Sequence, residues 1–210
     1  MVNVYAMKKL TGIALCAVVL LIGGCRGEVS QKECILPGDC QLQTGDIVFR
    51  KGCGVTSHAV VMAEGNGDYS HVGIVVDSAG HAMIVHAVPD EPDFDGDVDR
   101  VKMDAPEKFF SAVNALTGEV RRYKNPEVAR RVAAKAVEIY KRHTLFDHDY
   151  DESDTTKLFC TELVTFAFDR VGCPLKDVPR STLNLLGMHL HCALPSDLLE
   201  SKDFKSVRRF

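Results

Sequence analysis

The sequence predicts an α+β fold. The β-like segments 46–50, 71–76 and 82–88 lie in the first half of the chain, whereas the long helical patterns 126–140 and 160–171 lie in the second. Strands and helices that are segregated along a chain are typical of this class. The 210 residues, of which 46% are hydrophobic, suffice for one core, and no internal repeat divides them.

The elements of the first half are predicted from local patterns. Residues 46–50 alternate as a strand does, while residues 58–62 fit either a helix or a strand. Segments 71–76 and 82–88 are rich in Val, Ile and Ala, and they flank Asp77–Gly80, whose composition is typical of a hairpin turn. We therefore expect these two segments to form a β-hairpin.

The second half begins with a short helix at Asp104–Glu107, where an acid, an early Pro and a following Glu form a start signal. Residues 119–123 return as a strand. Asn125–Pro126 then caps the helix that runs to Tyr140. After an acidic loop over 143–156 and a second long helix, residues 194–199 are expected to form a helical turn.

The N-terminus carries a processing signal. Lys8 and Lys9 precede the apolar run Leu10–Ile22, which is short for a membrane span, and small residues then lead to Cys25. This segment resembles a bacterial lipoprotein signal, which implies a lipidated Cys25 at the mature N-terminus. An uncleaved membrane anchor is the alternative.

The expected organisation is therefore a signal over 1–25, a polar tether over 26–41 and a catalytic domain over 42–210. This places the protein in the bacterial cell envelope, attached to a membrane through its lipid. The net charge of -4, the absence of Trp and the lack of a basic run argue against a nucleic-acid partner.

The remaining cysteines do not pair completely. Cys16 leaves with the signal and Cys25 takes the lipid, so six remain, at positions 34, 40, 53, 160, 173 and 192. If Cys160 is a free thiol, five are left, which is an odd number. Cys34 and Cys40 are close enough in sequence to close a loop as a disulfide.

Cys160 is expected at the first turn of the helix that ends at Gly172–Pro174. The free N–H groups and the helix dipole at such a position favour a thiolate over a thiol. A cysteine held in this way is a candidate nucleophile. The alternative is a small buried core residue.

Two histidines are the candidate partners of this thiol. If Asp77–Gly80 is the hairpin loop, His71 lies directly opposite His86, with Cβ atoms about 5 Å apart on one face of the sheet. His81 is at an odd offset from His86 and therefore points to the other face. His71 would accept the proton of Cys160, and His86 would orient His71.

Four motifs together carry a resemblance to a known family. They are Leu42–Arg50, Tyr69–Val75, Val85–Ala87 and Leu158–Val164. They resemble the permuted papain-like cysteine hydrolases of the NlpC superfamily, specifically the YiiX/YebB-like group, over about Leu42 to Asp197. The resemblance implies a circularly permuted papain-like α+β fold with an antiparallel sheet packed against helices.

The resemblance also implies the roles of the site residues. Cys160 would be the nucleophile, His71 the base and His86 the third polar member, a position often held by a carboxylate in this group. No cofactor is implied. The expected reaction is cleavage of an amide, peptide or isopeptide, in cell-wall peptide fragments. A lipid acyl hydrolase or acyltransferase and a catalytically idle binding lipoprotein are the alternatives.

Ser57 and Tyr69 lie near the predicted site in the sequence, and the resemblance to the family makes them candidates for a substrate cleft. Glu162, two residues after Cys160, is a further candidate. The alternative for Glu162 is a solvent-facing or helix-anchoring role. A metal site made by His71, His86 and Cys160 is the competing explanation of the main constellation, since such ligands suit Zn²⁺.

Three further segments contain metal-ligand residue types: His189–Cys192, Asp93–Asp99 and Asp147–Asp154. The first would place two histidines on one strand face, where they could bind a metal, but we expect ordinary surface or core histidines there. The two acidic segments suggest calcium loops, but Gly96 is misplaced and no Glu closes either loop. We expect solvated loops there.

Overall fold

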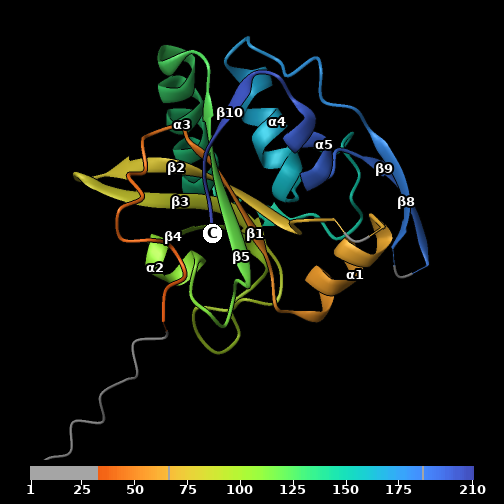
Figure 1. Cartoon of the computed structure of the whole chain (residues 1–210). Coiled ribbons are helices and arrows are strands. Elements are labelled where there is room, and N and C mark those ends of the chain that lie inside the picture. The colour runs from red at the N-terminus through yellow and green to blue at the C-terminus, as the bar shows by residue number, and fades with distance from the viewer. Residues whose placement is uncertain (1–32, 66, 186) are drawn as a thin grey trace, which may run out of the picture. The chain divides into compact units, whose positions relative to one another are not determined.

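The computed structural model describes residues 33–65, 67–185 and 187–210 (Figure 1). The expected signal segment 1–25, including Cys25, lies outside these residues, as does much of the predicted tether. Within the described ranges, no helix is long and apolar enough to cross a membrane. These residues belong to one structural unit.

A large sheet forms the framework of this unit. In the described part of the chain, eight strands follow the spatial order β10-β5-β1-β2-β3-β4-β6-β7. Neighbouring strands are antiparallel except for the parallel pair β6–β7. The strands are β1 (Ile47–Lys51), β2 (His71–Ser78), β3 (His81–Val88), β4 (Arg100–Asp104), β5 (Thr117–Tyr123), β6 (Leu145–Phe146), β7 (Lys157–Leu158) and β10 (Phe204–Arg209).

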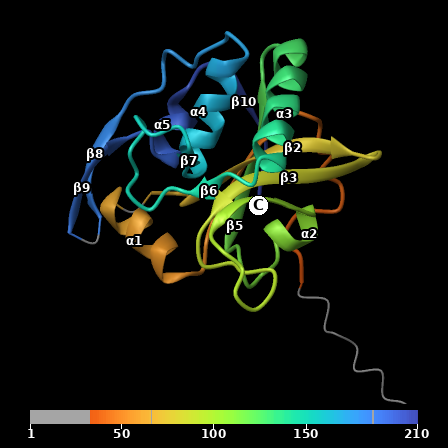
Figure 2. The same ribbon diagram turned by 180° about the vertical axis from the view of Figure 1, so that it is seen from behind.

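Two long helices cover one face of the sheet. Helices α3 (Pro126–Lys141) and α4 (Cys160–Arg170) pack against each other and against β2 and β3. Both views show them together over these strands, with the short helix α2 (Pro106–Phe109) apart from them (Figures 1 and 2). The fold is therefore α+β, as the order of elements in the sequence predicts.

A smaller assembly flanks the end of the sheet. Helix α1 (Val55–Ala63) contacts β8 (Ser181–Leu185), which forms a separate hairpin with β9 (Met188–Cys192). Both views place α1 beside this hairpin (Figures 1 and 2). The segment 58–62, which fits either a helix or a strand by sequence, lies in α1. Helix α5 (Pro195–Glu200) follows β9.

Alternation along the strands separates two apolar layers. Val72, Ile74 and Val76 of β2 belong to the main core with α3 and α4, while Val75 joins a second cluster around Phe109 and Phe110. Successive side chains of a strand point to opposite faces, so both faces of β2 are buried. His71 shares the face of Val75.

The predicted hairpin is present, but its register differs from the expected one. Strands β2 and β3 continue to Ser78 and His81, which pair across a two-residue turn at Ala79 and Gly80 with φ of 54° and 83°. His71 is therefore diagonal to His86 rather than directly opposite. The difference of two residues keeps both histidines on one face, because side chains alternate with a period of two.

Residues 33–41, expected as part of a tether, pack on the second apolar layer. Cys34 forms a β-bridge with Ser111, and the Ile35 N–H donates to the Phe110 carbonyl at 2.9 Å. Ile35 and Leu36 pack against the apolar cluster that contains Phe110. The structured domain therefore begins before Leu42. The described cysteines are all free, so the predicted disulfide between Cys34 and Cys40 is absent.

Candidate active site

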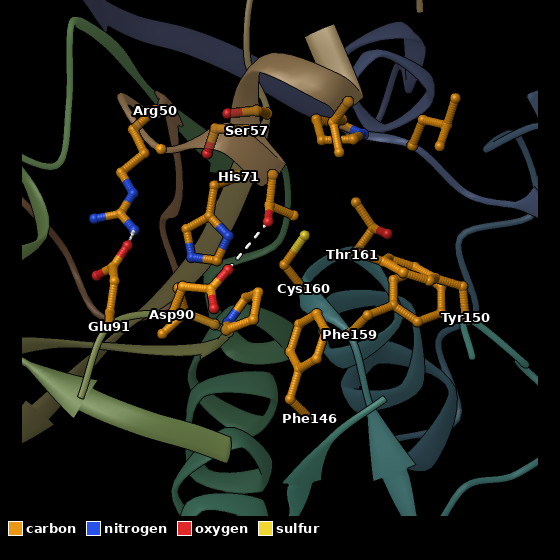
Figure 3. Close-up of a pocket in the computed structure, with 18 of the residues that line it drawn as sticks. Arg50, Ser57, His71, Asp90, Glu91, Phe146, Tyr150, Phe159, Cys160 and Thr161 are labelled. Atoms are coloured by element: carbon orange, nitrogen blue, oxygen red, sulfur yellow. Dashed lines mark hydrogen bonds and ion pairs between the residues drawn. The ribbon is translucent and has the colours of Figure 1, made fainter. Parts of the chain in front are cut away.

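Cys160 is the first residue of α4, and its side chain reaches the beginning of β2. The backbone N–H groups of Val72, Thr161 and Cys160 itself approach the sulfur. Cys160 and His71 line one pocket, and Figure 3 labels both among its lining residues. Packing of α4 on β2 thus joins two residues that are 89 positions apart in the sequence.

The histidines form a chain of contacts that extends beyond the predicted pair. Nε2 of His71 lies 2.9 Å from Nδ1 of His86, and Nε2 of His86 lies 3.1 Å from Oδ2 of Asp104. His86 is fully buried, and the other two are buried almost as deeply. They sit on the neighbouring strands β2, β3 and β4 and share one face.

Packing holds the two rings in place. The Phe109 ring of α2 lies 5.0 Å from the His86 ring in an edge-to-face arrangement and 5.7 Å from the His71 ring, centroid to centroid. Gly73 leaves the necessary space, because a Cβ there would lie 3.2 Å from Cβ of His86 and 2.6 Å from Cγ2 of Ile84. A side chain at this position would push against β3.

The protonation state of Cys160 differs from the expected thiolate. Burial raises the pKa of the thiol to about 11, and this outweighs the N–H groups of Val72 and Thr161, which act to lower the pKa. The helix terminus does supply the expected donors. The resting side chain is nevertheless a thiol, because removal from water penalises its charged form more strongly.

His71 is neutral for a related reason. Burial, the nearby Arg50 guanidinium and His86 together hold the pKa of His71 well below its ordinary value. The free site therefore rests as a thiol beside a neutral imidazole. If this sulfur were to act as a nucleophile, its proton would have to pass to His71 during the attack, as it does in hydrolases with a hydroxyl nucleophile.

Arg50 forms one side of the site. Its side chain is almost fully buried, with Nη1 donating to the Phe109 carbonyl at 2.8 Å and the guanidinium 4.6 Å from the centroid of the Phe109 ring. Nη2 pairs with Glu91, as Figure 3 shows. This carboxylate offsets the buried charge, whose remaining field disfavours a cation on His71.

The pocket has a volume of about 240 Å³ and two different walls. The wall near His71 is polar and includes Arg50, Ser57, Ser70, Asp90 and Glu91. The wall beyond Cys160 is apolar, with Phe146, Tyr150 and Phe159 labelled in Figure 3, and Leu183, Leu190 and Leu194 also line the pocket. Cys160 lies between them.

A hydrogen bond links two segments at the pocket. The Thr56 hydroxyl of α1 donates to Asp90 Oδ2 at 3.1 Å, and Asp90 follows β3 with a positive φ of 61°. This contact ties α1 to the loop after β3. Access to Cys160 is thus framed by α1, by this loop and by the β8–β9 hairpin.

The structure places the three candidates for the substrate cleft differently. Ser57 lines the pocket, but Tyr69 and Glu162 do not. The Tyr69 hydroxyl donates to Glu119 at 3.1 Å within the sheet, and Glu162 accepts a hydrogen bond from the Phe159 N–H at 3.4 Å. Glu162 is therefore buried at the start of α4, where it caps the helix, and does not face a substrate.

The carboxylates of both acidic segments form ion pairs with lysine or arginine side chains of the protein itself. Lys157 lies within 3.4 Å of Asp147 and 2.9 Å of Asp149. In the other segment, Arg100, Lys102 and Lys108 pair with Asp93. Among the described residues, no group of three His, Cys, Asp or Glu side chains is arranged to hold a metal ion, at these segments or at the site.

A comparison with solved structures relates the fold to a known protein. The crystal structure of metalloprotein YiiX from Escherichia coli O157:H7, described as DUF1105, matches with a TM-score of 0.63 at 19% sequence identity. The match covers 81% of this chain and 99% of that chain. The chain has a YiiX-like fold. No protein-family model and no curated protein matches the sequence.

Two residues of the site in this YiiX-like fold, Asp104 and Arg50, were not predicted from the sequence. Asp104 was interpreted as a helix cap, yet it ends β4 and contacts His86. Arg50 was placed in a strand without a role. The usable signal was the alternation in Arg100–Asp104, which puts Lys102 and Asp104 on one face. Charged residues on an inward face suggest a buried polar network.

Proposed function

We propose that this protein is a cysteine hydrolase in which Cys160 is the nucleophile and His71 is the base. The observation that carries the proposal is that Cys160 and His71 line one pocket, and that His71 is backed by contacts through His86 to Asp104. A nucleophile, a base and a residue that orients the base are the parts that this chemistry requires. The resemblance of the sequence motifs to permuted papain-like hydrolases supports the same assignment.

The proposed reaction has two halves. Cys160 gives its proton to His71 as the sulfur attacks the carbonyl carbon, and His71 then protonates the leaving group as the carbon–heteroatom bond breaks. In the second half, His71 takes a proton from water, whose oxygen attacks the thioester. The acid leaves and the thiol is reprotonated. Backbone N–H groups around the sulfur, such as that of Thr161, are donors for the oxyanion.

The substrate that we propose is an amide, as a peptide or isopeptide bond in cell-wall fragments. The envelope location expected from the N-terminal signal favours such substrates. The polar wall of the pocket, with Arg50, Ser57, Ser70 and Asp90, offers charged and hydrogen-bonding groups for a peptide. A small peptide fits the dimensions of the pocket better than an intact polymer does.

The apolar wall favours a second candidate, hydrolysis or transfer of a lipid acyl group. Phe146, Phe159 and Leu190 line the side of the pocket beyond Cys160. An alkyl chain would bury apolar area there at about 25 cal/mol per Å². The same nucleophile and base would act on the ester.

The YiiX structure is described as that of a metalloprotein. The site of this chain does not suit a metal, because the facing ring nitrogens of His71 and His86 contact each other and Nε2 of His86 contacts Asp104. The proposed reaction therefore uses no metal ion.

The test compares wild type with Cys160→Ala and His71→Ala on purified muropeptides and on phospholipid vesicles, with products followed by mass spectrometry. We expect hydrolysis by wild type and a loss on the order of 10³-fold or more in either variant. Cys173→Ala is the matched control, since Cys173 is also a half-buried free thiol but does not line the pocket.

The outcome distinguishes the alternatives. Cleavage of muropeptides alone supports the amidase, and cleavage of phospholipids alone supports the acyl hydrolase. If wild type cleaves neither, or if Cys160→Ala is as active as wild type, the hydrolase proposal is wrong, and the idle binding lipoprotein gains support.

A further inference from the structure

We infer that Asp104 is a positioning residue that sets the direction of the hydrogen bonds through His86 to His71. This inference deepens the proposed function and rests on it only for the role of Cys160. Asp104 contacts His86 and Lys108 and does not line the pocket. Its effect therefore has to pass through the two rings.

The surroundings of Asp104 keep its carboxyl group ionised. Burial acts to raise the pKa of Asp104, but the hydrogen bond from His86 and the hydrogen bond and charge of Lys108 outweigh it, and the pKa lies well below its ordinary value. Nζ of Lys108 is 2.9 Å from Oδ1, which leaves Oδ2 to His86 at 3.1 Å. The spacing of four residues brings Lys108 back over Asp104 at the start of α2.

An ionised carboxylate accepts hydrogen bonds and cannot donate them. Nε2 of His86 must therefore carry a hydrogen. Burial lowers the pKa of His86, so the ring is neutral and has one N–H group, and its Nδ1 is then an acceptor. The atom that faces this acceptor at 2.9 Å, Nε2 of His71, must consequently donate.

The tautomer of His71 follows from this sequence of contacts. With the hydrogen on Nε2, Nδ1 of His71 has a free lone pair and is the atom that can accept the proton of Cys160. Without the carboxylate, the contact between the two rings is equally satisfied in the opposite direction. His71 would then carry its hydrogen on Nδ1 and could not act as a base.

Asp104 also explains how a histidine, His86, can be the residue that orients His71. A neutral ring stabilises a neighbouring imidazolium less well than a carboxylate does. Here the anion lies one contact further along, beyond His86. When His71 takes the proton, the positive charge develops on a pair of rings that ends at a carboxylate, 3.1 Å from His86.

The first test uses the wild-type protein and needs no activity. Long-range ¹H–¹⁵N correlation spectra of ¹⁵N-histidine-labelled protein at neutral pH report which ring nitrogens carry hydrogen. We expect both His71 and His86 to be protonated on Nε2 alone. Protonation of His71 on Nδ1, or of His86 on Nδ1, would overturn the inference.

The second test is Asp104→Asn, in which the amide is nearly isosteric but can donate as well as accept. We expect His71 to populate both tautomers and kcat on the substrate identified above to fall about 10²- to 10⁴-fold, with little change in KM. Lost activity with an unchanged His71 tautomer would assign Asp104 a structural role and refute ours.

Asp46→Asn is the matched control. Asp46 is also a buried carboxylate in an ion pair, held by Arg122 Nε and Nη2, both at 2.8 Å, and it does not line the pocket. We expect a loss of stability without a change in tautomer or kcat. If Asp104→Asn does not fold, the wild-type spectra still decide. If Cys160→Ala stays active, the hydrolase proposal fails while the tautomers remain a separate result.

Discussion

At the residue scale, opposing effects act on the sulfur of Cys160. Two backbone N–H groups at the start of α4 and that of Val72 in β2 stabilise a thiolate, whereas the surrounding protein removes the sulfur from water. The rise of the thiol pKa from 9 to about 11 shows that desolvation is the larger effect, by about 3 kcal/mol. A helix N-terminus alone therefore does not establish an activated cysteine.

This balance predicts how Cys160 reacts with iodoacetamide. Because the thiol pKa lies near 11 and His71 is neutral, the alkylation rate should rise about tenfold per pH unit from pH 6 to 9, without a plateau. The rate is measured at Cys160 by mass spectrometry of the modified peptide, with free N-acetylcysteine as the reference. A plateau in the acidic range would reveal a preformed thiolate–imidazolium pair and contradict the neutral pair.

At the element scale, the start of α4 depends on Glu162. This side chain is 3% exposed, and burial raises its pKa to about 8, although the Phe159 N–H acts to lower it. Asp147 and Glu152 contribute by repulsion. The buried carboxyl group is therefore largely protonated at neutral pH, and the helix that carries Cys160 begins beside a group that resists ionisation.

Replacement of Glu162 by Gln should stabilise the protein at alkaline pH. A raised folded-state pKa gives stability that is complete below the unfolded value of 4.5 and is lost as pH rises through about 8. The loss between pH 5 and 9 amounts to about 4 kcal/mol, or ~10 °C in Tm. The Gln amide oxygen still accepts from the Phe159 N–H and does not titrate.

Thermal unfolding of both proteins from pH 5 to 9 measures this effect. We expect the Tm of Glu162→Gln to exceed that of wild type increasingly toward pH 9, with little difference at pH 5. Parallel Tm curves would mean that Glu162 is ionised in the folded state. Glu127→Gln, on the exposed first turn of α3, is the control that removes a carboxyl group without burial.

The same scale shows what the sequence could and could not predict. The hairpin, α3 and α4 were predicted because their apolar residues are periodic and their ends carry caps or turn residues. The turn was misplaced because Asp77 and Ser78 continue β2 and Ala79 adopts a positive φ, which composition assigns to other residues. Strand register depends on such details of the turn.

Strand β4 was missed for a different reason. Lys102 and Asp104 point inward, so the segment lacks the usual pattern of apolar residues toward the core and polar residues toward solvent. Their burial is possible because Asp93, Lys108 and His86, which come from other elements, satisfy their charges. Local patterns predicted that His71 and His86 share one face and that Cys160 begins a helix, but the contact of His86 with Asp104 depends on tertiary structure.

At the scale of the whole molecule, the pocket is assembled from distant parts of the chain. The sheet provides His71, α4 provides Cys160, and α1 together with the β8–β9 hairpin forms the outer walls. Helix α1 exposes Val55 and Met62, which are 83% and 75% accessible.

Attachment to a membrane would bring such a protein close to envelope substrates. That attachment is predicted to depend on Cys25, since the N-terminal segment resembles a lipoprotein signal. Stable anchoring by acyl chains takes more than one chain, because each buried CH₂ contributes about 0.8 kcal/mol. We expect wild type to partition into the detergent phase of Triton X-114 and Cys25→Ser to lose the acyl mass. Mass spectrometry of the N-terminal peptide measures both the cleavage and the modification.

Cys16→Ser is the matched control, because Leu15 precedes Cys16 and the position lacks the small residues that lead to Cys25. It should be processed and lipidated as wild type is. If wild type retains residues 1–24 and carries no acyl mass on Cys25, the segment acts as an uncleaved anchor. Hydrolysis of a soluble substrate in detergent should be the same for both variants, since Cys160 and its partners lie in the separate domain. Loss of activity only toward membrane-embedded substrate would show that the lipid supplies proximity and plays no part in the chemistry.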